Sequence, residues 1–361
     1  MSRGVRAVVD LTALRHNLGV ARAAAPASRL MAVVKADGYG HGLRQVASAL
    51  LSADAFAVSC LEEALALREA GLLHPIVLLE GFFDGAELRA IASHRLDIVL
   101  HADWQLQIFE RARLPRPLRV WLKVDTGMHR LGFAPGRVQT LFERLRANRA
   151  VSEIRLMTHL ACADDRDSTY TERQLATFQA ACEGLPAERS IANSAGLLAW
   201  PAVHADWVRP GIMLYGVSPF TDGWSERPPL RPVMTLTSRL IAIQHYRRGD
   251  PVGYAGGFVC PEDMPVGVVA IGYGDGYPRH APNGTPVLVA GQRTSIVGRV
   301  SMDMLCVDLR GLDQVRVHDP VTLWGEGLPV EEVASACGTI PYELLCKLTR
   351  RVPFDYRDGE A

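Results

Sequence analysis

The sequence contains very little lysine. Only Lys35, Lys123 and Lys347 occur among its 39 basic residues, and the other 36 are arginines. Arginine serves as well as lysine, or better, for surface charge and ion pairs. A lysine retained in such a chain is therefore a candidate for a role that needs an amine able to lose its proton. Chance retention is the competing interpretation for Lys123 and Lys347.

Three further absences narrow the class of protein. Basic and acidic residues balance at 39 each without forming blocks, which argues against nucleic acid or an anionic membrane surface as the main partner. Residues 1–19 lack the apolar core of a signal peptide, and no apolar run is long enough to span a membrane, so we expect a cytoplasmic protein. The seven cysteines are scattered and never form CxxC, so the sequence predicts neither a disulfide framework nor a zinc site.

Short apolar runs alternate with helical patterns from residue 30 to about residue 215. A strand followed by a helix, repeated, predicts a parallel sheet. Eight repeats over roughly 200 residues fit a closed α/β barrel better than an open doubly wound sheet. The predicted strands are 30–35, 55–59, 75–79, 97–100, 118–124, 154–160, 189–194 and 207–216, and a helix at 11–25 precedes them.

The pattern changes after a proline-rich polar stretch at 219–232, which we interpret as a linker. The following runs alternate β-branched and polar residues without intervening helices and are separated by turn residues, as is typical of an antiparallel β domain. We therefore predict an α/β barrel over residues 1–225, followed by a mainly antiparallel β domain over residues 226–361.

Chemically useful residues follow several of the predicted strands. In α/β barrels the carboxyl ends of the strands meet at the active site, so we expect these residues to gather there. They are Lys35 and Tyr39 after the first strand, Arg130 after the fifth, His159 at the end of the sixth, Asn193 and Ser194 at the end of the seventh, and Arg209 and Gly211 within the eighth run.

A lysine at the inner mouth of a barrel is partly desolvated and close to arginines, and both effects favour the neutral amine that can form a Schiff base. The loops after the seventh and eighth strands are the usual phosphate-binding place of this fold. A Schiff-base lysine and a phosphate-binding site in the same barrel together predict pyridoxal phosphate as the cofactor. Lys35 would carry it, and Tyr39, Ser194, Gly211 and Ile212 would hold its phosphate.

Eight segments, in the same order, match a known family: VVKADGYGHG, DTGMHRLGF, THLACADD, NSAG, VRPGIMLYG, VGYAGG, IGYGDGYPR and VGRVSMDM. Over nearly its whole length the chain resembles the bacterial alanine racemases, pyridoxal-phosphate enzymes of fold type III. The first and last segments are the most specific. The resemblance implies interconversion of L-alanine and D-alanine, either supplying D-alanine for cell-wall peptidoglycan or serving alanine catabolism.

The resemblance also implies roles for single residues of the barrel. Arg209 faces the pyridine nitrogen of the cofactor, and His159 belongs to the network behind it. An arginine does not supply a proton, so the ring stays neutral and withdraws electrons less strongly, which disfavours side reactions such as transamination. Arg130 lies beside the cofactor's phenolic oxygen and the substrate carboxylate.

Racemisation removes a proton from one face of Cα and delivers one to the other, so two opposed bases are expected. Lys35 can serve one face. By resemblance Tyr254 serves the other and comes from the β domain of a second subunit, which makes a homodimer part of the mechanism. Tyr273, Met302 and Asp303 would enter the same partner site and contact the substrate.

Some positions depart from the family pattern. The segment that begins at Tyr254 reads YAGGF, where relatives more often have a glycine next to the tyrosine and a more polar continuation. Arg350 occupies a place at which some members have a tyrosine bound to the phosphate, so that contact is not carried over. Lys123 matches a position that is carbamylated in some members, and an ordinary lysine paired with an acid is an equal alternative.

Other functions are compatible with the same fold. A racemase of broader specificity or for serine would use the same residues. A barrel-type decarboxylase would place an acid rather than Arg209 at the ring nitrogen. A non-catalytic cofactor carrier would need neither the β domain nor Tyr254.

Overall fold

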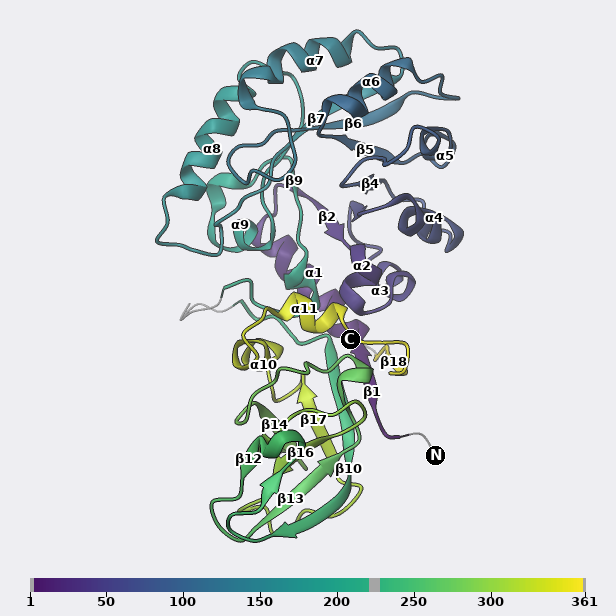
Figure 1. Ribbon diagram of the computed structural model, residues 1–361. Helices are drawn as coiled ribbons and strands as arrows, with labels where there is room; N and C mark the ends of the chain where they lie inside the picture. Colours follow the sequence, from purple (N-terminus) through teal and green to yellow (C-terminus); the bar gives the residue numbers. More distant parts are fainter. Residues whose placement is uncertain (1–2, 221–227, 360–361) are drawn as a thin grey trace.

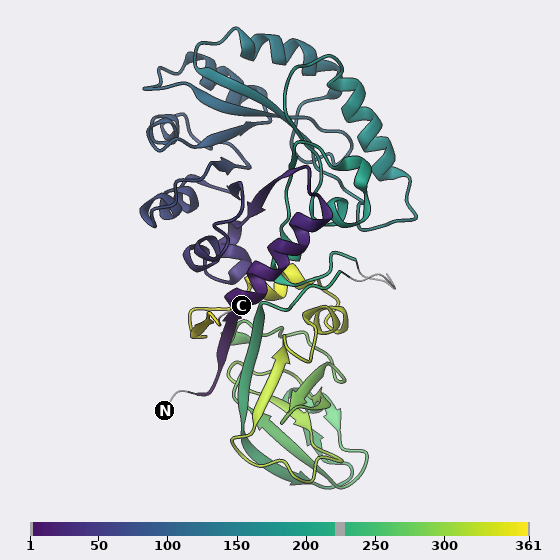
Figure 2. The same ribbon diagram turned by 180° about the vertical axis from the view of Figure 1, so that it is seen from behind.

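The computed structural model describes residues 3–220 and 228–359 and contains two bodies (Figure 1). A barrel ringed by helices forms the upper body in this view, and a β domain forms the lower one. Figure 2 shows the same division from behind. Over the described residues no helix combines the length and apolar character needed to cross a membrane.

The barrel is closed by eight parallel strands, which confirms the predicted fold class. Each strand pairs with the next, and the last pairs with the first through Arg29 opposite Trp207 and Leu30 opposite Val208. The strands are β2 (Arg29–Val33), β3 (Ala55–Val58), β4 (Ile76–Leu78), β5 (Asp97–Leu100), β6 (Leu118–Lys123), β7 (Val151–Met157), β8 (Arg189–Ser190) and β9 (Trp207–Val208).

Helices cover the outside of the barrel, and their apolar sides pack on the strands. They are α1 (Leu11–Ala24), α3 (Leu43–Ala49), α4 (Leu61–Glu69), α5 (Glu87–Ser93), α6 (Asp103–Arg111), α7 (Val138–Arg146), α8 (Tyr170–Ala181) and α9 (Ser194–Ala199). The short segment α2 (Lys35–Gly40), directly after β2, is instead a turn with non-helical backbone angles. Short 3₁₀ turns lie at η1 (Pro135–Arg137), η2 (Pro201–Val203) and η3 (Ile212–Tyr215).

The last two barrel strands are much shorter than the runs predicted for them. After β8 the chain leaves the sheet because Asn193 caps α9, its Oδ1 accepting a hydrogen bond from Gly196 N at 2.9 Å. After β9 the chain reaches Pro210, which has no N–H to donate to a neighbouring strand. Both short strands place polar residues directly at the mouth of the barrel.

The interior of the barrel is filled, so the chemistry is confined to one end. Trp121 and Trp207 are buried inside, and Arg155 lies over both rings at 5.2 and 5.0 Å. Arg155 also forms ion pairs with Glu153 at 2.6 Å and Glu188 at 2.9 Å. These side chains fill the barrel interior, and in this fold the active site lies at the carboxyl ends of the strands.

The β domain is a mainly antiparallel sheet in which six strands close on themselves, because β10 pairs with both β13 and β17. Its strands are β10 (Met234–Tyr246), β11 (Pro251–Val252), β12 (Phe258–Val259), β13 (Met264–Val269), β14 (Pro286–Val289), β15 (Gln292–Val297), β16 (Leu305–Asp308) and β17 (Pro320–Trp324). It also contains η4 (Tyr254–Gly256), η5 (Tyr273–Asp275), α10 (Val330–Ala336) and α11 (Pro341–Cys346).

Both ends of the chain join this sheet. Strand β1 (Arg6–Asp10) pairs antiparallel with β10, and β18 (Phe354–Arg357) pairs parallel with β1. The first strand of the chain therefore belongs structurally with the β domain, although the barrel follows it in sequence. The predicted boundary at residue 225, and residues 221–227 of the predicted linker, lie outside the described residues.

Candidate active site

Lys35 follows β2 and begins a turn in which the next four residues have left-handed backbone angles. Ala36, Asp37, Gly38 and Tyr39 all have φ between 52° and 62°, the left-handed region. For residues other than glycine this conformation costs about 1–2 kcal/mol each, so the surrounding contacts must hold it. Asp37 supplies two of them, because its carbonyl accepts from Gly42 N at 2.9 Å and its Oδ1 accepts from Leu43 N at 2.7 Å.

The left-handed turn places the ring of Tyr39 against aromatic residues from distant segments. It stacks on Tyr215 of η3 with 4.6 Å between ring centroids and lies 6.0 Å from the ring of Tyr342 in α11. Burial raises the pKa of the Tyr39 phenol above its ordinary value, so this hydroxyl stays protonated and is a hydrogen-bond donor. A Cβ built on Gly211 would lie 2.6 Å from Tyr39 Oη, so only glycine leaves room for the phenol.

Ser194, Gly211 and Ile212, which we name the anion site, meet beside this phenol. Ser194 Oγ accepts hydrogen bonds from Gly211 N at 2.9 Å and Met213 N at 3.4 Å. Ile212 begins η3, and the first N–H groups of a helical turn have no partner within it. The Ser194 hydroxyl and the N–H group of Ile212 at the start of this turn suit a phosphate.

Arg209 is almost completely buried directly after β9, and its guanidinium is held by neutral groups only. Nη1 donates to Ser190 Oγ at 2.6 Å, and Nη2 donates to the Thr158 carbonyl at 2.6 Å and the Ile191 carbonyl at 3.3 Å. Burial lowers the pKa of Arg209 to about 10, so it remains charged near neutral pH. Within the described residues its Nε–H has no acceptor, which leaves a donor for a ligand.

His159 lies next to Arg209, with 3.5 Å between its Nδ1 and Arg209 Nη2. Burial, followed by the charges of Arg209 and Lys123, lowers the pKa of His159 well below its ordinary value. The imidazole is therefore neutral, and it can accept a hydrogen bond from Arg209 only through an unprotonated Nδ1.

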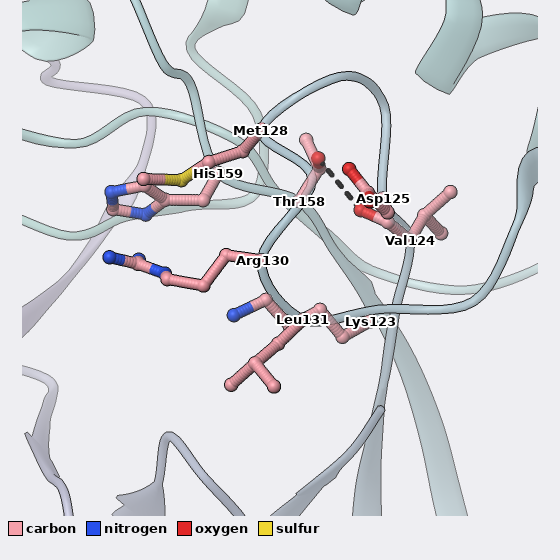
Figure 3. Close-up of a pocket in the computed structure, with 8 residues that line it drawn as sticks. All are labelled: Lys123, Val124, Asp125, Met128, Arg130, Leu131, Thr158 and His159. Atoms are coloured by element: carbon pink, nitrogen blue, oxygen red, sulfur yellow. Dashed lines mark hydrogen bonds between the residues drawn. The ribbon is translucent and has the colours of Figure 1, made fainter. Parts of the chain in front are cut away.

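Lys123 and Arg130 line a pocket together with His159, and Figure 3 shows the nitrogen-bearing ends of all three pointing to the same side. Burial, followed by the charges of Arg209 and Arg130, lowers the pKa of Lys123 to about 8. Together with Lys35, these cations gather at one end of the barrel. Within residues 3–220 and 228–359 none of Lys35, Lys123, Arg130 and Arg209 forms an ion pair, so the site is suited to anionic ligands.

The low pKa of Lys123 predicts a pH dependence of stability. Below a pH of about 8 the buried amine is charged in the folded protein, and its burial lowers the free energy of unfolding. Between about pH 8 and 10.5 the amine is protonated in the unfolded chain but neutral in the folded protein, so this destabilisation is progressively lost as the pH rises. We expect Lys123→Met to melt above the wild type at about pH 7, by a margin that shrinks towards about pH 10. Thermal unfolding of the cofactor-free protein at equal concentrations measures this.

Lys347→Met is the control, because Lys347 pairs with Glu343 at 2.8 Å on the surface and should show no such trend. A carbamylated Lys123 would be anionic and would stabilise the neighbouring arginines. A Lys123→Met protein that melts below the wild type at about pH 7 would therefore contradict the free-amine interpretation.

The four residues predicted to reach a partner subunit lie on the β domain. Tyr254 is 66% exposed, Met302 is 53% exposed and Tyr273 is 39% exposed. The segments of Tyr273 and Met302 touch, since Gly274 N donates to the Met302 carbonyl at 2.9 Å. In Figure 1, strand β12, which follows Tyr254 in sequence, lies in the β domain well below α2, which begins with Lys35.

An ionic cluster holds these exposed segments in place. Asp275 is completely buried and receives two hydrogen bonds from Arg3, at 2.9 and 3.0 Å. Arg351 approaches Asp275 at 3.3 Å and also bonds Asp303 at 2.5 Å. Asp303, predicted to contact substrate, is thus tied to an arginine of its own chain, and this hydrogen bond lowers its pKa.

The fold brings to the site several residues that the sequence pattern did not indicate. Tyr342 lies beside Tyr39, whereas Arg350, which was matched to a phosphate-binding tyrosine of some family members, is exposed. Ser190 and Thr158 hold Arg209. A weak signal was present for these two, because each stands at or next to a strand end, but nothing in the local pattern of α11 indicates Tyr342.

Fold and candidate site together define a protein with a closed α/β barrel, a lysine directly after its first strand and buried cationic groups at the mouth. The family models for the N-terminal and C-terminal domains of alanine racemase match residues 9–219 and 233–356. The chain belongs to the alanine racemase family and is an amino-acid racemase, an isomerase.

Individual relatives agree over the whole length. The alanine racemase of Halorhodospira halophila is 61% identical, with 100% of both chains covered. The catabolic alanine racemase of Pseudomonas putida is 54% identical over 98% of this chain and 99% of the relative. The crystal structure of the biosynthetic alanine racemase from Pseudomonas aeruginosa has a TM-score of 0.96 at 49% identity, covering 99% and 100% of the two chains.

Proposed function

We propose that this protein interconverts L-alanine and D-alanine with pyridoxal phosphate, using Lys35 and Tyr254 of a second subunit as opposed bases in a homodimer. The observation that carries the proposal is the gathering of unpaired cations, Lys35 among them, beside the anion site. A doubly anionic phosphate and a substrate carboxylate are the ligands that such a site attracts.

The residues present fit the cofactor. The anion site offers a hydroxyl and backbone N–H groups, and Gly211 leaves the space that the Tyr39 phenol needs. The free Nε–H of Arg209 suits a ring nitrogen that accepts a hydrogen bond. When bound, pyridoxal phosphate supplies an electron-withdrawing ring that acidifies the Cα–H bond of the amino acid.

The side chains of the protein then determine where the proton removed from Cα goes. Arg209 donates a hydrogen bond without giving up its proton, so it moderates electron withdrawal and favours proton return at Cα over transamination. Arg130, exposed at the mouth, is placed to bind the substrate carboxylate. Lys35 takes or returns the proton on one face of Cα.

The second base comes from another copy of the chain. Tyr254 is largely exposed and its segment lies far from Lys35 in one chain, which supports a shared site. Tyr273 and Met302 are exposed beside it and would accompany it across the interface, whereas Asp303 would hold the segment through Arg351. This supports a homodimer in which each barrel is completed by the partner's β domain.

The residues of the site do not determine whether the reaction supplies D-alanine or serves alanine breakdown. A racemase accelerates both directions equally, so the same residues serve D-alanine supply and alanine breakdown. Relatives named biosynthetic and catabolic are similar to this chain to comparable degrees. The match of both domain models favours this function over a decarboxylase or a cofactor carrier.

Cofactor titration combined with racemisation assays tests the proposal. The purified protein is expected to bind pyridoxal phosphate with a yellow absorbance and to interconvert the two alanines. Gly211→Ala is expected to raise the Kd for the cofactor about tenfold or more, because its Cβ displaces the Tyr39 phenol. Gly19→Ala in α1, whose Cβ meets nothing within 4 Å, is the control and should bind normally.

The proposal fails if the wild type takes up no pyridoxal phosphate and leaves L-alanine unchanged. Release of carbon dioxide from any amino acid without racemisation would favour the decarboxylase. Deuterium exchange at Cα, measured over a panel of small amino acids, reports the breadth of specificity, which a pocket limits only weakly for one methylene or hydroxyl group.

A further inference from the structure

His41 is completely buried directly after the left-handed turn that carries Lys35 and Tyr39. Its Nε2 has no hydrogen-bond partner among the described residues. A buried polar atom without a partner is unfavourable, and an apolar ring of similar size would avoid this cost. The presence of an imidazole at this position therefore needs a reason other than filling space.

The other ring nitrogen supplies that reason. His41 Nδ1 lies 2.8 Å from the carbonyl oxygen of Tyr39. A carbonyl only accepts, so Nδ1 carries the hydrogen, and Nε2 is left as the bare, unpaired nitrogen. Burial lowers the pKa of His41 to about 4, so the ring keeps this neutral form near neutral pH.

The ring of His41 also contacts Tyr215, with 4.7 Å between the ring centroids. Tyr215 in turn stacks on Tyr39 at 4.6 Å and donates from Oη to the Val33 carbonyl at 3.1 Å. The three rings of His41, Tyr215 and Tyr39, which we name the ring stack, thus link the backbone and the side chain of Tyr39 to the end of β2.

We propose that His41 is a positioning residue that holds Tyr39 in its left-handed conformation and so aims the Tyr39 phenol at the anion site. The inference rests on the proposed function, in which this phenol binds the phosphate of pyridoxal phosphate. A left-handed tyrosine is intrinsically unfavourable, and the Nδ1–H bond to its carbonyl stabilises it. Tyr39 Oη lies close to Gly211, so a small rotation of the turn moves the donor away from the anion site.

The test compares His41→Phe, Tyr39→Phe and the double variant in titrations of the cofactor-free protein with pyridoxal phosphate. His41→Phe keeps an aromatic ring against Tyr215 and removes the hydrogen bond to Tyr39. We expect it to raise the Kd about tenfold, and Tyr39→Phe to raise it by at least as much. In the Tyr39→Phe background, His41→Phe should change the Kd less than about twofold, because the phenol it positions is absent.

A side chain that only fills space at this position predicts a different result. Replacing a buried imidazole that has an unpaired nitrogen by phenylalanine would keep or raise the melting temperature and leave the Kd unchanged. His41→Asn, whose amide can donate to the Tyr39 carbonyl, should recover part of the affinity if the hydrogen bond matters, and it serves as the second variant if His41→Phe folds poorly.

His74→Phe is the matched control. His74 also has one ring nitrogen facing a carbonyl, at 3.0 Å from Leu51 O, and a buried Nδ1 without a partner, but it lies before the amino end of β4. The Kd of the His74→Phe protein for pyridoxal phosphate should equal that of the wild type. A wild-type Kd for His41→Phe, or effects of His41→Phe and Tyr39→Phe that multiply in the double variant, would overturn the proposal. Failure of the proposed function would instead appear in the wild type itself, as absence of cofactor binding.

Discussion

Lys35→Ala is expected to lower the rate of alanine racemisation in both directions by about 10⁴-fold, because the amine serves both as the attachment point of the cofactor and as one of the two bases. Initial rates with each enantiomer at saturating pyridoxal phosphate measure the loss. The melting temperature of the protein should change little, since Lys35 is half-buried at the mouth and forms no ion pair within the described residues.

Lys35→Arg makes the test more specific. Arginine keeps the positive charge but does not lose a proton near neutral pH, so we expect this variant to be as inactive as Lys35→Ala. If the residue served only to attract anions, Lys35→Arg would stay active. Lys347→Arg, on the surface beside Glu343, is the control and should keep wild-type activity. A Lys35→Ala protein within about tenfold of the wild-type rate would refute the assignment.

Tyr254→Phe is expected to lower kcat by about 10²–10⁴-fold while leaving the cofactor bound, because it removes only the second base. The loss should be asymmetric. In deuterated water the variant should still exchange the Cα hydrogen of the enantiomer that Lys35 deprotonates, and not that of the other enantiomer. Tyr246→Phe, at the end of β10 in the same domain, is the control and should retain both exchange reactions.

Mixing the two inactive proteins tests whether the sites are shared. A mixed dimer of Lys35→Ala and Tyr254→Phe chains contains one barrel with Lys35 that faces an intact Tyr254 of the other chain. Random reassociation should therefore restore about one quarter of the wild-type activity. If Tyr254 acted within its own chain, the mixture would be no more active than its components.

Much of the barrel could be predicted from sequence because its signal is local. Runs such as 97–100 and 118–124 are apolar and rich in β-branched residues, and helical spacing separates them, so the strands β5 and β6 lie where the pattern predicts. The same pattern overestimated β8 and β9. Their predicted runs include a helix cap and a proline, which end the strands while the apolar character continues.

A site residue could be predicted where its type or its position in the sequence is unusual. Lys35 stands out through the scarcity of lysine, and Ser194, Arg209 and Gly211 through their places at strand ends. Tyr342 and His41 do not. Their importance comes from contacts with Tyr39 and Tyr215, which only the packed structure contains.

The sequence by itself determined the alternation of strands and helices, the two-domain order, and the amine and hydroxyl groups available for chemistry, since these depend on residue type and short-range spacing. The tertiary structure alone decided three further features. It set the left-handed conformation of residues 36–39, the pairing of β1 and β18 with the β domain, and the contacts of Tyr342 and His41 with the rings of Tyr39 and Tyr215. The reason is that each of these features depends on contacts between segments far apart in the chain, and no local pattern encodes such contacts.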